Sequence, residues 1–272
     1  MDLSIREIQF ESLRILKLID SISKKENLHY TLHFGSLLGA IRHKGFIPWD
    51  DDLDIAMLRP DYEKLKNYFI EHKNELKPFE FFSPETRSNY PYMLGRVVNT
   101  SFKMVSESEP DFGMGTFVDV YAFDGAGNGR HQIVYYLSCF LTTLYGLKNK
   151  IYFVKTFGKL RSFFKRILFY LCRLFSYKFL QKNLYALASR YSLIDSEYVA
   201  CLTWMDGGKP LVFNSDFFKE TIMIDFEDGK YPVPKNYDAI LRKLYGDYMV
   251  LPPENERIGH HYYKILSGDE VI

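Results

Sequence analysis

A run of aspartates at the entrance to an apolar segment constrains this sequence more than any other feature. Four carboxylates fall within five positions, at Asp50, Asp51, Asp52 and Asp54. Like charges this close repel each other and raise each other's pKa, so such a cluster lies either in solvent or around cations. The alternation from Asp52 to Leu58 predicts a strand with Leu53 and Ile55 facing the core. Asp52 and Asp54 then share the other face, where both can hold metal ions, and hard oxygen ligands suit Mg²⁺ or Mn²⁺.

Two simpler interpretations of the aspartate run stay open from the sequence. An isolated acidic run is most often a solvated loop. An EF-hand loop also begins with spaced aspartates, but Ile55 stands where that loop needs glycine, and no Glu stands at its last ligand position.

Gly35 and Ser36 favour the metal interpretation. They lie between a predicted strand over 28–34 and a predicted helix over 37–43. The backbone N–H groups of such a turn, at the start of a helix, attract phosphate. A Gly-Ser turn followed by a strand with Asp-x-Asp is the arrangement of nucleotidyltransferases, in which the turn holds the donor phosphates and the carboxylates hold metals. We therefore expect Gly35 and Ser36 to bind phosphate.

That arrangement needs a third carboxylate from a later strand, and Asp119 is the best candidate. It stands in an apolar, β-rich run from Gly115 to Tyr121, where an aspartate has no obvious structural reason to be. The alternative is an aspartate that caps a turn at a strand end, which suits Asp124 better because Gly125 follows it.

The remaining pattern predicts an α+β fold, with mixed α/β character and a small mixed sheet flanked by helices. A capping box at Ser4 and Glu7 precedes apolar residues at helical spacing over 5–24. A further helix is expected over 61–72, and further strands over 92–98, 101–105 and 116–121.

The segment from Gly125 to Ile194 has no Asp or Glu, although the whole chain of 272 residues carries a net charge of only +1. Lys and Arg alternate there with Phe, Tyr, Leu and Ile at helix-like density. Two interpretations of the stretch 148–182 stay open. It can be an interfacial segment that meets an anionic membrane surface. It can equally be a helical subdomain packed on the sheet, with its Lys and Arg solvated.

These shifts in composition predict three parts of the chain. We expect residues 1–125 to form the nucleotidyltransferase-like catalytic core, 126–194 a basic, aromatic helical insertion, and 195–272 a C-terminal part that completes the active site. The charge balance does not indicate a nucleic-acid partner. The N-terminus lacks the basic and then apolar order of a signal peptide, and the three cysteines offer no disulfide framework. We therefore expect a cytoplasmic protein, either free or in peripheral contact with the inner face of the plasma membrane.

Three stretches of the sequence resemble the LicD family of phosphocholine transferases, relatives of fukutin and fukutin-related protein. The first is Phe34-Gly-Ser-Leu-Leu-Gly-Ala-Ile-Arg-His-Lys-Gly-Phe-Ile-Pro-Trp-Asp-Asp-Asp-Leu-Asp-Ile55. The second is Phe117-Val-Asp-Val-Tyr-Ala-Phe-Asp-Gly125, in which Ala122 stands where many relatives have Pro, a change that leaves Asp119 in place. The third is Tyr245-Gly-Asp-Tyr-Met-Val-Leu-Pro-Pro-Glu-Asn-Glu-Arg-Ile-Gly-His-His261.

The resemblance implies a metal-dependent enzyme that transfers phosphocholine from CDP-choline to a sugar hydroxyl of a cell-surface glycan. In bacteria the acceptor would be a precursor of lipopolysaccharide, capsule or teichoic acid. Some relatives transfer ribitol phosphate or glycerol phosphate instead. From the residues alone, an Asp-x-Asp glycosyltransferase and a non-catalytic glycan- or choline-binding module also stay open.

The motifs and the family resemblance together imply a role for each candidate residue. Metals lie on Asp52, Asp54 and Asp119, while Asp50 and Asp51 orient the ligands or the acceptor. His260 is the candidate general base, and the residues expected to contact substrate or its phosphates are Gly35, Ser36, Arg42, Lys44, Arg257 and His261. A choline head group needs an aromatic cage, for which the candidate walls are Tyr90, Tyr92, Trp204, Tyr262 and Tyr263.

Overall fold

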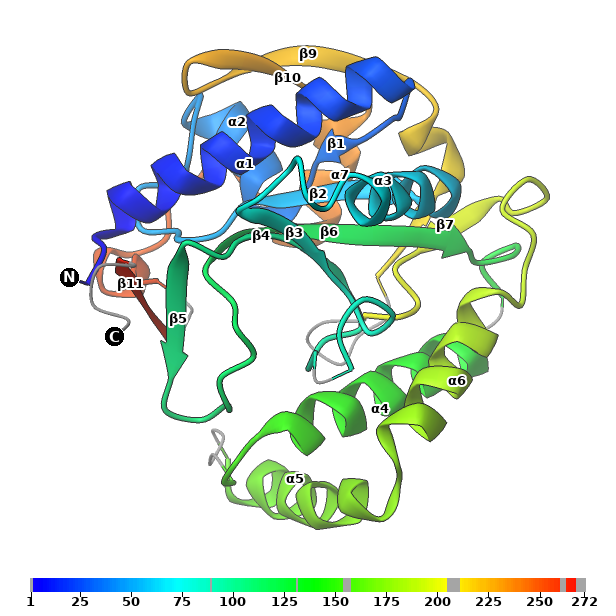
Figure 1. The fold of residues 1–272 in the computed structure, drawn as a ribbon. Coiled ribbons are helices and arrows are strands. Elements are labelled where there is room, and N and C mark those ends of the chain that lie inside the picture. Colours follow the sequence, from blue (N-terminus) through cyan, green and yellow to red (C-terminus); the bar gives the residue numbers. More distant parts are fainter. Residues whose placement is uncertain are drawn as a thin grey trace.

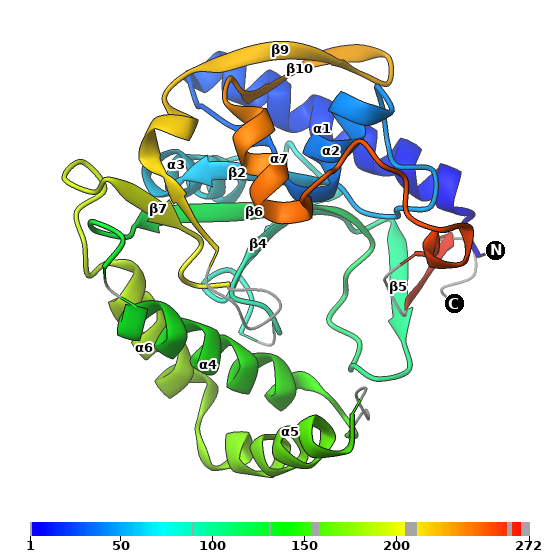
Figure 2. The ribbon, with the colours of Figure 1, turned by 180° about the vertical axis from the view of Figure 1, so that it is seen from behind.

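A computed structural model describes residues 2–88, 90–130, 132–153, 158–204, 211–259 and 263–267 of the chain. The fold is α+β, as the sequence predicts, with helices on a curled mixed sheet (Figures 1 and 2). The elements in chain order are α1 (Ile5–Glu26), β1 (Thr31–Leu32), α2 (Phe34–Arg42), β2 (Asp54–Leu58), α3 (Arg59–Glu71), β3 (Phe79–Phe82), β4 (Gly95–Asn99), β5 (Phe102–Ser106), β6 (Thr116–Gly125), α4 (Gln132–Asn149), α5 (Lys159–Leu171), η1 (Cys172–Leu174), α6 (Tyr177–Ala188), β7 (Tyr198–Ala200), β8 (Val212–Asn214), η3 (Ser215–Phe218), β9 (Thr221–Phe226), β10 (Gly229–Pro234), α7 (Tyr237–Tyr245), η4 (Glu254–Glu256) and β11 (Tyr263–Ser267).

The main sheet runs in the order β1-β2-β6-β4-β3, and β7 and β8 extend it from the far end of β6. β2 and β6 run parallel, whereas β4 pairs with β6 in the antiparallel sense. β6 therefore lies between the strand that follows the aspartate run and the strand of Arg96. It is the central strand of the site.

Helix α1 crosses the sheet on the side opposite α4, α5 and α6 (Figure 1). It starts as predicted, since the side chain of Ser4 accepts from the backbone N–H of Glu7 and the carboxylate of Glu7 accepts from the backbone N–H of Ser4. Ile15, Leu16 and Ile19 are fully buried against the sheet. This packing holds the sheet rigid behind the aspartates.

The structure corrects three local predictions around α2 and β2. The strand expected over 28–34 is reduced to Thr31–Leu32, because α2 already begins at Phe34. Gly35 and Ser36 consequently lie in the first turn of the helix, and not in a turn before it. The strand expected from Asp52 begins at Asp54, so Asp52 precedes the strand. Leu53 and Ile55 are fully buried, as predicted.

Helices α4, α5 and α6 form a layer of their own on the side of the sheet away from α1 (Figures 1 and 2). Their contact surfaces share a small core that includes Leu144, Tyr145, Phe169, Leu180 and Leu184. The layer leaves the sheet after Gly125, the last residue of β6, and β7 returns to pair with the same strand end. Among the described helices, none has both the length and the apolar character needed to cross a membrane.

Candidate active site

Three aspartates from two distant parts of the chain meet at one edge of the main sheet. One carboxylate oxygen from each of Asp52, Asp54 and Asp119 lies within 4.8 Å of the others. Asp54 and Asp119 are partners in the parallel register of β2 and β6. The backbone N–H of Asp119 donates to the carbonyl of Leu53 (2.8 Å), which fixes the two strands in this alignment.

Asp54 is held from both its backbone and its side chain by the first turn of α2. The hydroxyl of Ser36 accepts from the backbone N–H of Asp54 (2.8 Å), and the backbone N–H of Gly35 bonds to the Asp54 carboxylate. A Cβ at residue 35 would lie 2.7 Å from Oδ2 of Asp50, so glycine is needed for this close approach. The helix start expected to bind phosphate therefore positions a carboxylate.

The charge of Asp54 has little compensation from the part of the chain that the structure describes. Burial, followed by the negative charges of Asp52, Asp119 and Asp50, raises the pKa of Asp54 well above its usual value. Its Oδ1 is buried and has no hydrogen-bond partner among the described residues. A buried carboxylate oxygen without a donor is costly unless a cation or a proton meets it. The donor set of Asp52, Asp54 and Asp119, all oxygen ligands, fits a hard divalent cation such as Mg²⁺ or Mn²⁺.

Asp119 has a fixed positive partner in Arg96, its antiparallel neighbour on β4. Nε of Arg96 donates to Oδ1 of Asp119 (2.5 Å), and Nη2 donates to Oδ2 (3.3 Å). The guanidinium also lies between the rings of Tyr92 and Phe117, at 4.2 and 4.0 Å from their centroids. Burial lowers the pKa of Arg96, but the charge of Asp119, the nearby Tyr90 and Tyr92 and the hydrogen bond to Asp119 together outweigh it, and the net shift is upward. Arg96 stays charged and orients Asp119.

His33 lies beneath the cluster as the N-cap residue of α2. Its backbone N–H donates to the carbonyl of Asp54 (3.0 Å). Its ring is fully buried against Phe34 and Phe123, and neither ring nitrogen has a hydrogen-bond partner among the described residues. Burial lowers the pKa of His33 to about 3, so the imidazole is neutral at physiological pH.

The carboxylates face an open cavity of about 660 Å³. Its acidic side is formed by Asp50, Asp52, Asp54 and Asp119. Its other walls combine aromatic, aliphatic and polar side chains. The aromatic ones are Phe34, Tyr92, Tyr121, Trp204, Tyr245 and Tyr263, and Ser106 and Ser108 are among the polar ones. Lys150 and Glu109 close one end and form an ion pair (2.6 Å). The cavity therefore combines a cation site with surfaces suited to a planar or cationic ligand.

The structure brings several predicted residues to this cavity and leaves others away from it. Asp50 and Gly35 line it, whereas Asp51 is half-buried beside the cluster and is not part of the lining. Arg42 donates from Nη1 to the carbonyl of Tyr248, and Lys44 is exposed. Neither residue lines the cavity.

Arg257 is not part of the cavity lining. Its guanidinium is 5.7 Å from the centroid of the Trp49 ring, and its Nε donates to the carbonyl of Pro252. His260, His261 and Tyr262 lie outside the described residues. Of the candidate walls of a choline cage, Tyr92, Trp204 and Tyr263 line the cavity, whereas Tyr90 is buried behind it.

Arg96, Tyr121 and Tyr245 line the site but were not among the residues expected from the sequence. Arg96 carried a detectable signal, since it is a charge within the apolar predicted strand 92–98, the criterion that identified Asp119. Tyr245 had no such signal. In the fold, burial and then the charges of Asp54, Asp50 and Asp52 raise the pKa of Tyr245. The tyrosine therefore lies close to the aspartate cluster.

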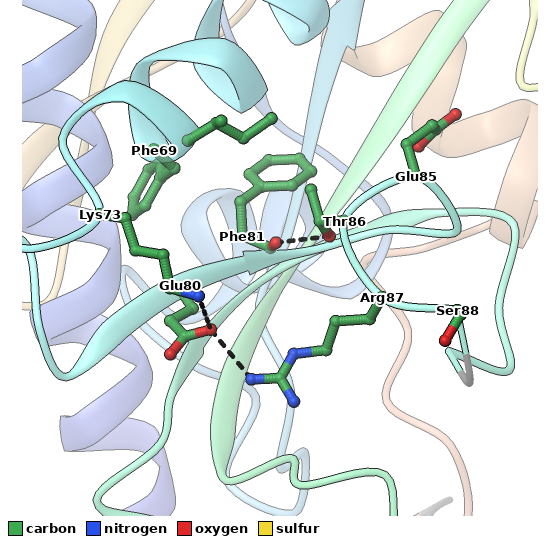
Figure 3. Close-up of a pocket in the computed structure, with 9 residues that line it drawn as sticks. Phe69, Lys73, Glu80, Phe81, Glu85, Thr86, Arg87 and Ser88 are labelled. Carbon is green, nitrogen blue, oxygen red and sulfur yellow. Dashed lines mark hydrogen bonds and ion pairs between the residues drawn. The ribbon is translucent and has the colours of Figure 1, made fainter.

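A second cavity of about 660 Å³ lies between α3 and the loop after β3, away from the aspartates (Figure 3). Its charged side chains neutralise one another, because Glu80 pairs with Arg87 (2.9 Å) and lies 3.9 Å from Lys73 (Figure 3). The hydroxyl of Thr86 donates to the carbonyl of Phe81 (2.8 Å). Its described lining holds no carboxylate cluster comparable to the one on β2 and β6.

Comparison with known proteins agrees with this geometry. The sequence model of the family described as LicD/FKTN/FKRP, nucleotidyltransferase domain, matches residues 27–134, a range that contains all three aspartates. The chain is 28% identical to the lipopolysaccharide cholinephosphotransferase LicD of Haemophilus influenzae over 95% of this chain and 96% of that protein. It is also 44% identical over 48 residues to uncharacterised proteins of Rickettsia prowazekii and Rickettsia typhi, a match that spans 18% of this chain and 18% and 16% of theirs.

Proposed function

We propose that this chain is a transferase of the LicD family, to which residues 27–134 are similar, and that it transfers phosphocholine from CDP-choline to a sugar hydroxyl of a cell-surface glycan. The observation that carries the proposal is the register pair of Asp54 and Asp119, with Asp52 beside it, at the floor of an aromatic cavity. The relative that matches along nearly its whole length is named as a lipopolysaccharide cholinephosphotransferase, which supports both the transferred group and the acceptor class.

The reaction is an in-line displacement at the phosphorus that bears choline. The acceptor oxygen forms a bond to that phosphorus, the bond to the bridging oxygen breaks, and CMP leaves with the bonding electron pair. The hydroxyl proton passes to a base, for which His260 stays the candidate from the sequence. No group other than donor and acceptor is consumed.

The aspartates would bind the cation that holds the donor, and neighbouring residues orient these aspartates. A divalent cation, Mg²⁺ or Mn²⁺, bound by Asp52, Asp54 and Asp119 would neutralise the diphosphate and its developing charge. Arg96 keeps Asp119 in the orientation needed for this, and the first turn of α2 does the same for Asp54.

The aromatic walls suit the choline head group. A quaternary ammonium ion cannot donate hydrogen bonds, and it binds through the faces of aromatic rings. Tyr92 and Trp204 contact each other edge to face, with centroids 5.7 Å apart, and both line the cavity together with Tyr263. A ribitol or glycerol phosphate donor would instead need hydrogen-bond partners for its hydroxyls. Ser106, Ser108, Glu109 and Lys150 also line the cavity, so a comparison of donors has to include both kinds of head group.

A donor panel tests the proposal. Purified protein with Mg²⁺ and a glycan acceptor should release CMP from CDP-choline faster than from CDP-ethanolamine, CDP-glycerol or CDP-ribitol, and the acceptor should gain the mass of phosphocholine. The variant Asp54→Asn, assayed beside it, should release none. Faster reaction with CDP-ribitol or CDP-glycerol would show that the transferred group is an alditol phosphate and not phosphocholine. Transfer of a sugar from a sugar nucleotide would show that the enzyme is a glycosyltransferase.

A further inference from the structure

Helix α5 presents its most apolar stripe to solvent. Leu160, Phe163, Phe164 and Ile167 are 70%, 59%, 56% and 47% exposed. Their spacing of three and four residues places them on one side of the helix. Tyr170, which is 60% exposed, extends this side by a further turn. We refer to these five residues as the outer face of α5.

The inward side of α5 mixes apolar and polar residues. Phe169 is buried in the core shared with α4 and α6, and the half-buried Ser162 and Lys165 lie on the same side of the helix. An ordinary surface helix buries its apolar stripe and exposes its polar one. Exposed apolar patches of this kind mark surfaces that bind a partner. α5 also lies at the edge of the molecule farthest from the main sheet in both views (Figures 1 and 2).

The charges around the outer face indicate the chemistry of that partner. The sequence has no Asp or Glu from Gly125 to Ile194. Lys159 and Arg166 on α5, and Lys178 and Lys182 on α6, are exposed. A partner must therefore offer apolar surface together with negative charge. A second copy of this chain would bring the same positive charges together at a symmetric interface, which is unfavourable.

An anionic membrane surface offers both properties, and the dimensions of α5 fit it. The helix has 13 residues, a length of about 20 Å, whereas crossing a bilayer needs about 20 apolar residues. We propose that α5 docks this protein in the plane of an anionic membrane, with its outer face at the acyl boundary and the neighbouring Lys and Arg at the lipid head groups.

The position of α5 relates this surface to the catalytic cavity. Lys165 and Phe169, on its inward side, line a smaller cavity of about 310 Å³. That cavity shares four lining residues with the catalytic cavity, namely Tyr92, Glu109, Lys150 and Trp204. An acceptor glycan carried on a membrane lipid would thus lie near the reacting group. This last step rests on the proposed function, whereas the membrane docking itself does not.

The test compares binding of the full chain to vesicles by sedimentation, without donor or acceptor. The vesicles contain phosphatidylcholine alone or phosphatidylcholine with about 30% phosphatidylglycerol. The test variant carries Phe163→Ser and Ile167→Ser. The control carries Phe10→Ser and Ile70→Ser on α1 and α3, where the two side chains are 50% and 52% exposed. All three proteins should melt at nearly the same temperature, because the replaced side chains are half in water.

We expect the unmodified chain to sediment with the anionic vesicles, and to do so less at high salt. The test variant should bind at least about tenfold more weakly, and the control should bind like the unmodified chain. Absence of binding, equal binding to neutral vesicles, or equal loss in both variants would overturn the proposal. A dimer in solution that becomes a monomer in the variant Phe163→Ser with Ile167→Ser would also overturn the proposal. The outer face would then be the interface with a second copy of the chain. Because the assay contains no donor, failure of phosphocholine transfer leaves its result unchanged.

Discussion

Asp54 and Asp119 face each other in register on the parallel strands β2 and β6, with their carboxylates close enough to share one cation. Two buried carboxylates in this relationship repel each other, and among the described residues Arg96 supplies a fixed counter-charge on the side of Asp119. The described residues thus leave Asp54 as the less compensated member of the pair. Its variants should be the most informative about the metal.

Asp54→Asn should separate stability from activity. Removing a buried charge next to like charges should raise the melting temperature in chelator, by the equivalent of about 1 kcal/mol or more. Mg²⁺ should raise the melting temperature of the unmodified chain and leave that of the variant unchanged. Transfer should fall at least about a hundredfold. Thermal melts with and without Mg²⁺ check this, with the exposed Asp195→Asn as control. An equal Mg²⁺ effect in Asp54→Asn would exclude the residue as a ligand.

Arg96→Met should destabilise the fold, because it leaves Asp119 buried without its partner. The expected loss in the free energy of unfolding is about 3 kcal/mol, measured by urea denaturation without divalent ions. Mg²⁺ should restore part of this loss, since a cation can replace the missing positive charge. The double variant Arg96→Met with Asp119→Leu should recover stability without Mg²⁺. If the double variant is as unstable as Arg96→Met alone, the loss comes from packing against Tyr92 and Phe117 and not from charge.

Gly35→Ala should weaken Mg²⁺ binding. The new Cβ would lie 2.7 Å from Oδ2 of Asp50 and 3.7 Å from Oδ2 of Asp54, so the first of these carboxylates must move. Titration of the Mg²⁺-dependent melting temperature should show an apparent affinity reduced by about tenfold. Gly146→Ala in α4 is the stability control, because its Cβ would meet nothing within 4 Å and alanine favours the helix by about 0.5–1 kcal/mol. Unchanged Mg²⁺ affinity in Gly35→Ala would mean that Asp50 moves freely.

His33 should contribute to loss of stability in acid. Its pKa is about 3 in the folded state and 6.5 when unperturbed, so between these values the unfolded chain binds the additional proton. Stability from this group is therefore complete above pH 6.5 and falls as the pH drops towards 3. At about pH 5 the loss amounts to about 2 kcal/mol.

The variant His33→Phe removes this proton-binding site while keeping a ring among Phe34 and Phe123. The drop in unfolding free energy between about pH 7.5 and pH 5 should be smaller in the variant by that same amount. Comparing the two slopes cancels any packing change that the larger ring introduces. Equal slopes would show that the ring of His33 reaches solvent or another partner in the folded state.

Features with a strictly local cause were predictable from the sequence. The capping box at Ser4 and Glu7 defined the start of α1, and Leu53 and Ile55 are buried as their alternation indicated. Asp119 was identified because the nucleotidyltransferase arrangement needs a third carboxylate and because an aspartate in an apolar strand has no obvious structural reason, and it pairs in register with Asp54. The second of these criteria, applied to Arg96, would have found the counter-charge.

Features set by tertiary packing could not be predicted in the same way. The helix at Phe34 starts early because the N–H of Gly35 and the hydroxyl of Ser36 bond to Asp54, a contact that requires β2 to be in place. Helical periodicity in α5 identifies an apolar stripe but gives no information on which side faces the core. In α5 that stripe, which includes Phe163 and Ile167, faces outwards.

The chain leaves β6 at Gly125 and comes back in β7, where Val199 pairs with that same Gly125. The helical layer is therefore an insertion whose two ends lie side by side at one end of β6. Such an insertion can be exchanged or reshaped in evolution without moving Asp54, Asp119 or Arg96, because the sheet is continuous without it. Where the enzyme works and what it is brought into contact with can thus diversify independently of the reaction it performs.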